Sequence, residues 1–385
     1  MQHPLSNASA DDKTASAGAP AGMPPRRWDG LRRRVVGGFF ARLFGGVGRA
    51  LCEPGQLPAR GIHRVLICRP NHRLGNALLI SPLLAEVEAL YPGAEIDIVS
   101  AGHAAGSLFG NRFLVRRIFS LPPKIARHLW FTIALLRQLR GNTYDLAIDA
   151  CDGSQSGRLL LAMVRARYKL GLPDAQQNPG SAWHALRGPE HFAQRGVFLL
   201  RTAYAGTLDG AYPPLTLRLA DDEREQARRA LAAILGEPAV SSTPRRPVLG
   251  LFTNATGAKR FDTSWWQQFV ARLRVLQPEL QIVDLVADHG QSQLGGEFAA
   301  YCMPSYYTRD LRRLAAMISN MDAFISADCG VMHLAVASGT PTLGLFSVTS
   351  AAKYGPYGPA NSAIDTRRLS PAEVASIASD WLSVP

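Results

Sequence analysis

A short stretch, residues 326–335, contains an aspartate, a cysteine, a glycine and a histidine within six positions. It follows an apolar strand pattern and opens a helical pattern. The start of a helix presents free backbone N–H groups and the positive end of the helix dipole, so this stretch can bind a diphosphate. Asp328 would also serve as an N-cap and His333 as a core histidine, and the stretch by itself leaves these interpretations open.

Two further loops carry groups suited to an anionic or sugar ligand. Residues 253–260 supply hydroxyls, an amide, a glycine and two cations, which can hold phosphate oxygens through backbone N–H groups and a lysine point charge. The spacing of a P-loop is absent from this segment. In residues 69–76, Gly75 permits close backbone approach at a helix start, although a plain strand-to-helix turn explains the same pattern.

All three loops follow predicted strands, in a chain where short apolar runs alternate with helical periodicity from Arg64 onward. This alternation predicts parallel sheets covered by helices, whose ligands bind beyond the carboxyl ends of the strands. The predicted strands are 65–67, 96–99, 145–148, 248–252, 282–286, 323–325 and 342–346. The predicted helices are 77–90, 128–140, 156–167, 221–235, one capped at Thr263 or Ser264, 308–318, 331–338 and one capped by Ser370.

Charge and composition limit the classes of partner that the chain can bind. The chain has 42 basic and 30 acidic residues, a net charge of +12, which favours anionic partners. Residues 26–49 hold seven arginines and one acid among bulky apolar side chains, which indicates contact with an anionic bilayer or a poorly ordered basic leader rather than nucleic-acid binding. No apolar run predicts a membrane span or a secretory signal, and the five scattered cysteines predict reduced thiols without a metal.

The chain resembles glycosyltransferase family 9, the ADP-heptose:lipopolysaccharide heptosyltransferases. The resemblance extends over about residues 62–385 in the family's order and spacing. Its most specific part is Asp328-Cys329-Gly330-Val331-Met332-His333-Leu334-Ala335, followed by Gly339-Thr340-Pro341. The supporting parts are the Leu74 to Pro82 segment, Ala258-Lys259-Arg260, and Tyr354-Gly355-Pro356 after Thr349.

The resemblance implies an α/β fold of GT-B type, with two Rossmann-like domains facing a central cleft. The predicted organisation is a flexible tail and basic leader (1–60), an N-terminal acceptor domain (61–220), a linker (221–247) and a C-terminal nucleotide-sugar donor domain with a final helix (248–385). The donor contacts that it implies are Asn254, Thr256, Lys259, Asp328, Gly330, Val331, His333 and Thr349. The acceptor loop contains His72, Arg73 and Gly75, and the basic stretch Arg112, Arg116, Arg117, Lys124 and Arg127 either faces the acceptor or is a solvated helix face.

Catalysis in this family inverts the anomeric centre and needs a base for the acceptor hydroxyl. Well-known members place an aspartate directly after the first-loop glycine, where this chain has Asn76. An amide is not a general base at neutral pH, so the candidate substitutes are Asp149 and Asp152, with His72 third. Asn76 itself is predicted to be a helix cap or an acceptor contact.

We predict a metal-independent inverting glycosyltransferase without cofactors, cytoplasmic and peripheral to the inner membrane. Its expected donor is ADP-heptose or another nucleotide sugar, and its expected acceptor an anionic lipid-linked oligosaccharide such as the lipopolysaccharide core or a related surface glycan. Fixed cations and a helix start would stabilise the diphosphate leaving group without a metal. The alternatives are a catalytically impaired nucleotide-sugar or glycan-binding protein and a nucleotide-sugar epimerase of similar architecture.

Overall fold

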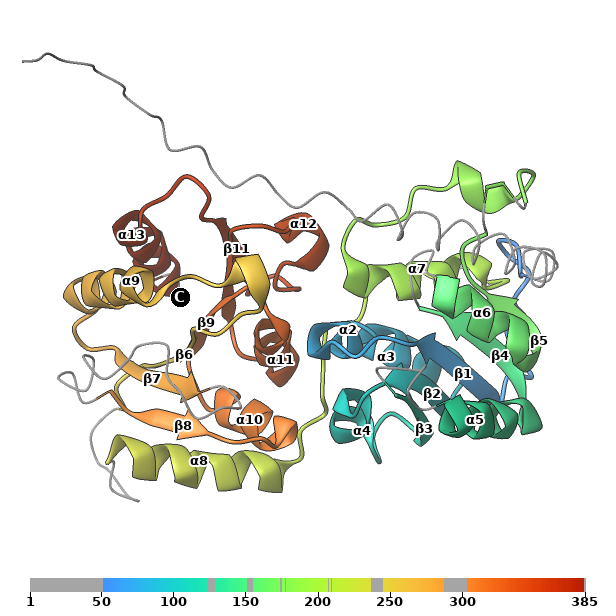
Figure 1. Cartoon of the computed structure of the whole chain (residues 1–385), viewed down its shortest axis with the longest axis horizontal. Helices are drawn as coiled ribbons and strands as arrows, with labels where there is room; N and C mark the ends of the chain where they lie inside the picture. The colour runs from blue at the N-terminus through green and yellow to red at the C-terminus, as the bar shows by residue number, and fades with distance from the viewer. Residues whose placement is uncertain are drawn as a thin grey trace, which may run out of the picture. The chain divides into compact units, whose positions relative to one another are not determined.

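Two parallel β-sheets organise the part of the chain that the computed structural model describes (Figure 1). That part comprises residues 51–122, 129–150, 155–173, 175–176, 178–206, 208, 210–236, 245–286 and 303–383. The predicted tail, the arginine-rich segment 26–49 and the candidate base Asp152 lie outside these ranges. Contacts group residues 46–385 into one compact unit.

Five strands form the first sheet, which is parallel throughout in the order β3-β2-β1-β4-β5. They are β1 (Arg64–Arg69), β2 (Glu95–Ala101), β3 (Val115–Leu121), β4 (Thr143–Asp149) and β5 (Arg165–Leu170). The helices are α2 (Leu74–Leu78), α3 (Ser81–Leu90), α4 (Ala104–Phe109), α5 (Leu129–Gly141), α6 (Gln155–Met163) and α7 (Phe192–Ala203). One face of the sheet packs against α2, α3, α4 and α7, and the other packs against α5 and α6.

Six parallel strands form the second sheet, in the order β11-β10-β9-β6-β7-β8. They are β6 (Val248–Phe252), β7 (Gln281–Val286), β8 (Ser305–Tyr307), β9 (Ala323–Ala327), β10 (Thr342–Phe346) and β11 (Ser362–Asp365). The helices are α8 (Asp221–Leu235), α9 (Thr263–Leu276), α10 (Leu311–Ile318), α11 (Gly330–Ser338), α12 (Ala351–Tyr354) and α13 (Pro371–Leu382). Helices α9 and α13 cover one face and α8, α10 and α11 the other (Figure 1). None of the helices in the described ranges is long and apolar enough to cross a bilayer.

The predicted alternation of strands and helices is confirmed, and every predicted strand is present. The four strands that the sequence pattern did not reveal, β3, β5, β8 and β11, are the outer strands of the two sheets. Central strands are buried on both faces and read as apolar runs, whereas outer strands carry charged and polar side chains that hide the pattern. The sequence therefore predicted the centre of each sheet and missed its edges.

Three local predictions were wrong at element boundaries. The helix expected over 77–90 is divided into α2 and α3. The helix expected over 156–167 ends at Met163, because the following residues form the outer strand β5. Helix α9 is capped by Asp262 instead of Thr263 or Ser264, since the Asp262 carboxylate accepts the Trp265 N–H at 2.7 Å. Ser370 caps α13 through a reciprocal capping box with Glu373, as predicted.

A half-buried arginine, Arg312, ties the two sheets together beside residues 211–220, which connect the first sheet to α8. The Arg312 guanidinium, on α10, bonds both carboxylate oxygens of Glu223 at 2.6 Å. It also donates to the carbonyls of Leu108 at 2.9 Å and Leu217 at 3.2 Å. The hydrogen bonds from Arg312 to the carboxylate are the main reason why the pKa of Glu223 is lowered to about 2. The Arg312 side chain thus joins α4, the connecting residues 211–220, α8 and α10.

Candidate functional site

The carboxyl ends of β6, β9 and β10 bring together three side chains from separate loops. Lys259 Nζ lies 2.6 Å from Asp328 Oδ2, and the Thr349 hydroxyl donates to the same oxygen. The Lys259 ammonium also lies 5.9 Å from the centre of the Tyr354 ring. Because β6, β9 and β10 are parallel neighbours, their carboxyl ends meet at one edge of the sheet. The cluster therefore presents one cation, one carboxylate and one hydroxyl at the usual ligand edge.

The cluster adjoins the start of α11, and Asp328 does not cap this helix. Its N-cap is Cys329, so the interpretation of Asp328 as an N-cap is wrong. The Asp328 N–H donates to the Leu345 carbonyl at 3.0 Å, which fixes the backbone, while the nearly buried carboxylate contacts Lys259. Gly330 and Val331 form the first turn of α11, whose N–H dipoles favour an anion.

His333, one turn into α11, is 3% exposed. Burial lowers its pKa to about 4, so the imidazole is neutral at physiological pH. Within the described part of the chain its Nδ1 has no hydrogen-bond partner. Buried polar atoms are nearly always bonded, so this nitrogen is a candidate contact for a ligand.

The first-sheet loop reaches this helix start through two glycines. A Cβ on Gly330 would lie 2.8 Å from Leu74 Cβ and 3.0 Å from the Gly75 nitrogen. A Cβ on Gly75 would lie 2.8 Å from His333 Cδ2. Both positions are therefore restricted to glycine by close packing, and two of the three predicted loops meet here.

Asn76 lies inside α2, so its interpretation as a helix cap is wrong. Its Oδ1 accepts a hydrogen bond from Arg69 Nη2 at 2.8 Å, and Arg69 Nη1 donates to the Ala150 carbonyl at 2.7 Å. Arg69 is 8% exposed and is a residue that the sequence reasoning did not single out. The signal for it was an arginine that ends a buried strand directly before the loop. Its fork orients Asn76 beside the carboxyl end of β4.

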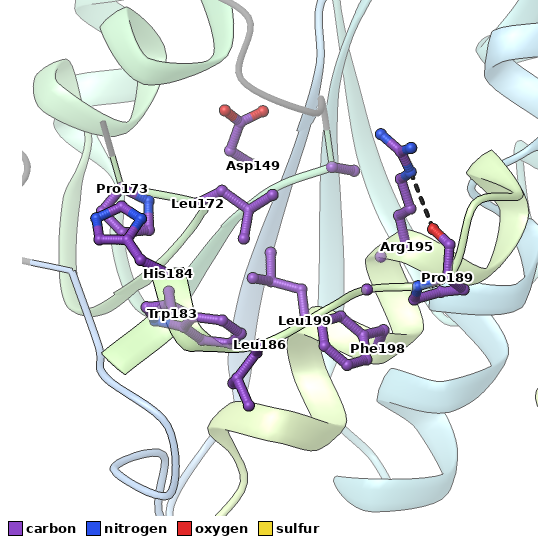
Figure 2. A pocket seen from close by; sticks show the side chains of 13 residues that line it. Asp149, Leu172, Pro173, Trp183, His184, Leu186, Pro189, Arg195, Phe198 and Leu199 are labelled. Carbon is purple, nitrogen blue, oxygen red and sulfur yellow. Dashed lines mark hydrogen bonds between the residues drawn. The ribbon is translucent and has the colours of Figure 1, made fainter. Parts of the chain in front are cut away.

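Asp149, the last residue of β4, lines a cavity of about 420 Å³ (Figure 2). Its carboxylate packs against the first turn of α6, where a Cβ on Gly157 would lie 2.1 Å from Oδ1. The Asp149 carboxylate is thus held against a helix start, whose dipole favours a nearby anion. The other candidate carboxylate, Asp152, is outside the described residues.

The remaining predicted residues surround these clusters. Arg73 is the N-cap of α2, and its N–H donates to Asn71 Oδ1 at 2.9 Å. His72 packs toward Gly102, where an added Cβ would lie 3.7 Å from His72 Cβ. Thr256 precedes the 3-10 turn Gly257–Lys259 and is exposed, whereas Asn254 is half-buried.

Helix α7 contributes residues that the sequence reasoning missed. His191 Nε2 lies 2.9 Å from the Gly355 carbonyl, and its Nδ1 accepts the Ala193 N–H at 3.2 Å. These bonds require a neutral ring protonated at Nε2, consistent with a pKa that burial lowers. The ring stacks on Tyr357 with 5.1 Å between the ring centres, so the start of α7 is fixed to the loop between α12 and β11. Arg195, in the first turn of α7, lines the same cavity as Asp149 (Figure 2).

The predicted basic stretch is only partly available to a ligand. Arg116 bonds the Asp97 carboxylate at 2.6 and 3.0 Å, and Arg112 lies 3.5 Å from Glu223. Arg116 and Arg117 are in strand β3 and Arg112 lies in the turn before it, so the prediction of a helix face is wrong for these three arginines. Arg117 is exposed. Lys124 and Arg127 lie outside the described residues.

Among the described side chains, no three His, Cys, Asp or Glu residues lie together as a metal site requires. Cys52, Cys68 and Cys329 form no disulfide within the described part of the chain. Cys151 and Cys302 lie outside the described ranges.

Several solved structures with a similar architecture are glycosyltransferases. A glycosyl transferase of family 9 from Veillonella parvula DSM 2008 superposes with a TM-score of 0.68 at 15% identity, covering 85% of this chain and 99% of that one. The E. coli ADP-heptose lps heptosyltransferase II gives 0.58 at 17% identity, covering 83% and 98%. The E. coli heptosyltransferase WaaC with ADP-2-deoxy-2-fluoro heptose gives 0.61 at 17% identity, covering 83% and 98%. A search of curated protein sequences gave no match.

The two parallel sheets and their helices form a GT-B fold, and with its sequence-profile match the protein is a glycosyltransferase. The sequence profile of glycosyltransferase family 9 (heptosyltransferase) matches residues 132–376, more than half of the chain. The chain therefore belongs to glycosyltransferase family 9. The predicted family, fold class and enzyme class are confirmed.

Proposed function

We propose that this glycosyltransferase transfers heptose from ADP-heptose, with inversion, to an anionic lipid-linked oligosaccharide such as a lipopolysaccharide core, at a cytoplasmic membrane surface. The observation that carries the donor half of this proposal is the contact of Lys259 with Asp328 at the start of α11. It is supported by the similar structures of E. coli heptosyltransferase WaaC with ADP and with ADP-2-deoxy-2-fluoro heptose.

In the proposed reaction the acceptor oxygen bonds to the anomeric carbon while the bond from that carbon to the diphosphate breaks. The leaving diphosphate gains negative charge, which Lys259 and the N–H groups of Gly330 and Val331 stabilise. Asp328 and Thr349 position Lys259 and the donor. The remaining proposed donor contacts are His333, through its unbonded Nδ1, and Asn254 and Thr256 in the loop after β6.

On the acceptor side, we assign the loop with His72, Arg73 and Gly75 to acceptor binding. The acceptor hydroxyl must lose a proton, and the proposed bases are Asp149 and Asp152. Asn76 would bind an acceptor oxygen through its amide N–H₂, since its Oδ1 is occupied by Arg69. The packing of Asp149 against α6 favours an anchoring role for this carboxylate, which leaves Asp152 as the preferred base.

The test is a donor screen followed by product analysis. ADP-heptose, ADP-glucose and UDP-glucose are titrated calorimetrically against the full-length protein. Turnover is then followed by mass spectrometry with a deep-rough lipopolysaccharide acceptor. Binding restricted to ADP-sugars and an acceptor mass increased by one heptose support the proposal. Binding of UDP-sugars only, or conversion of the free donor without transfer, contradicts it.

A second candidate, a nucleotide-sugar-binding protein without turnover, is favoured by one observation. Asn76 stands where the family's base is expected, and Arg69 already occupies its oxygen. Asp149→Asn and Asp152→Asn separate the two functions, with Glu190→Gln as an exposed control. If one carboxylate is the base, its variant loses about 10²–10⁴-fold in turnover while the Kd of the donor is kept. Donor binding with no turnover in the wild type favours the second candidate.

A further inference from the structure

Helix α5 exposes two adjacent aromatic side chains at its start. Trp130 is 82% exposed and Phe131 57%. The leucines of α5 have a different role, since Leu135, Leu136 and Leu139 pack onto the first sheet. The two aromatic side chains are therefore not part of the core. Large apolar side chains that lie together on a surface mark interaction sites.

The surrounding charge indicates what this surface binds. The sequence contains no acidic residue between Asp97 and Asp145, and this interval has seven lysines and arginines. Arg137, two helical turns after Trp130 and on the same face, is exposed, as is Arg117 on the outer strand β3. Aromatic side chains beside arginines on one helix are typical of segments that enter the headgroup region of an anionic bilayer.

The position of α5 relates this surface to the site. A crossover helix begins near the carboxyl end of the preceding strand, so the first turn of α5 lies toward the carboxyl edge of the first sheet. Arg69 and Asp149 lie at the same edge, at the ends of β1 and β4. A bilayer bound there would lie on the side from which a lipid-linked acceptor approaches the site.

We propose that the first turn of α5, through Trp130 and Phe131 with Arg137, docks the enzyme on an anionic lipid bilayer. This surface is separate from the arginine-rich segment 26–49 and contributes binding of its own. The proposal relies on the proposed function only for the lipid-linked acceptor. Docking itself is measured without donor or acceptor, so its failure and that of the proposed activity are distinguishable.

The test is co-sedimentation of the full-length chain with phosphatidylcholine vesicles that contain about 30% phosphatidylglycerol as the anionic lipid. Trp130→Ser with Phe131→Ser is expected to weaken binding at least about tenfold, because the apolar area that would enter the bilayer is lost. Arg137→Gln is expected to weaken it several-fold and only at low salt. Val275→Ser, which removes a 71% exposed apolar side chain from α9, is the control and should bind as the wild type does.

A second readout reports insertion at this position directly. Trp130→Phe keeps an aromatic side chain but removes the fluorophore, so vesicle binding should persist. Brominated lipids should then quench the fluorescence of the wild type more strongly than that of this variant. Equal quenching, or unchanged binding of the double serine variant, overturns the proposal and leaves the 26–49 segment as the source of binding. A change of oligomeric state in the double variant with unchanged vesicle binding also overturns it and identifies a second copy of the chain as the occupant.

Discussion

Replacing Lys259 with methionine tests the proposed donor site most directly. The change keeps the length of the side chain and removes the ammonium that lies 2.6 Å from Asp328. A charge-assisted hydrogen bond contributes about 1.5–3 kcal/mol, so the Kd of ADP should rise by roughly 10- to 150-fold. The unpaired Asp328 would also repel the diphosphate, which places the expected loss toward the upper end of this range.

The double variant Lys259→Met with Asp328→Asn separates these two contributions. Neutralising Asp328 removes the repulsion, so ADP binding should recover in part relative to the single lysine variant. Turnover should stay low in both, because removing one donor to a developing charge typically costs about 10²–10³-fold in kcat. Calorimetry with ADP and steady-state transfer rates measure the two effects.

Lys169→Met is the matched control, since Lys169 is a half-buried lysine on β5. It should keep the wild-type Kd for ADP. The reasoning is refuted if Lys259→Met binds ADP within about twofold of the wild type, or if the added Asp328→Asn change gives no recovery.

Three further predictions concern the neighbouring groups. Asn76→Asp places a carboxylate beside Arg69 and should raise turnover by about 10²-fold or more if this position can host the base; unchanged or lower rates would show that it cannot. Burial lowers the pKa of His333 to about 4, whereas an unfolded histidine has a pKa of about 6.5. As the pH falls from about 6.5 to about 4, the unfolded state takes up a proton that the folded state does not. The free energy of unfolding therefore falls by at most about 1.4 kcal/mol per pH unit. Denaturant unfolding of His333→Gln should show a flatter pH dependence in this window, and the exposed His103→Gln should not. Gly330→Ala should lower the melting temperature and kcat/KM together, because its Cβ would lie 2.8 Å from Leu74 Cβ, while Gly106→Ala, with open space around it, should be neutral or stabilising.

The fold was predictable where physical signals are local. Central strands such as β6 and β9 are buried on both faces and read as apolar runs. The capping box of Ser370 predicts the start of α13. The outer strand β5 shows no such signal, because a charged strand is compatible with a helix pattern.

The candidate site was predictable in part. Lys259, Asp328 and Thr349 were expected around one ligand, and they contact one another. The contacts of Arg69 with Asn76 and of His191 with Gly355 depend on side-chain directions across sequence separations of 7 and 164 residues. No spacing rule reveals such pairs, and burial of an arginine or histidine becomes visible only in three dimensions.

The contacts of Arg312 between the two sheets affect how the protein unfolds. The apolar core on one side of the first sheet continues without a break into the core around α8, α10 and α11. Leu217 and Leu231, on either side of residue 220, belong to this one cluster. A fragment ending at residue 220 would therefore expose apolar surface that the intact chain covers, and aggregate. Heating should melt both sheets in one calorimetric transition, since one core cluster is shared between them.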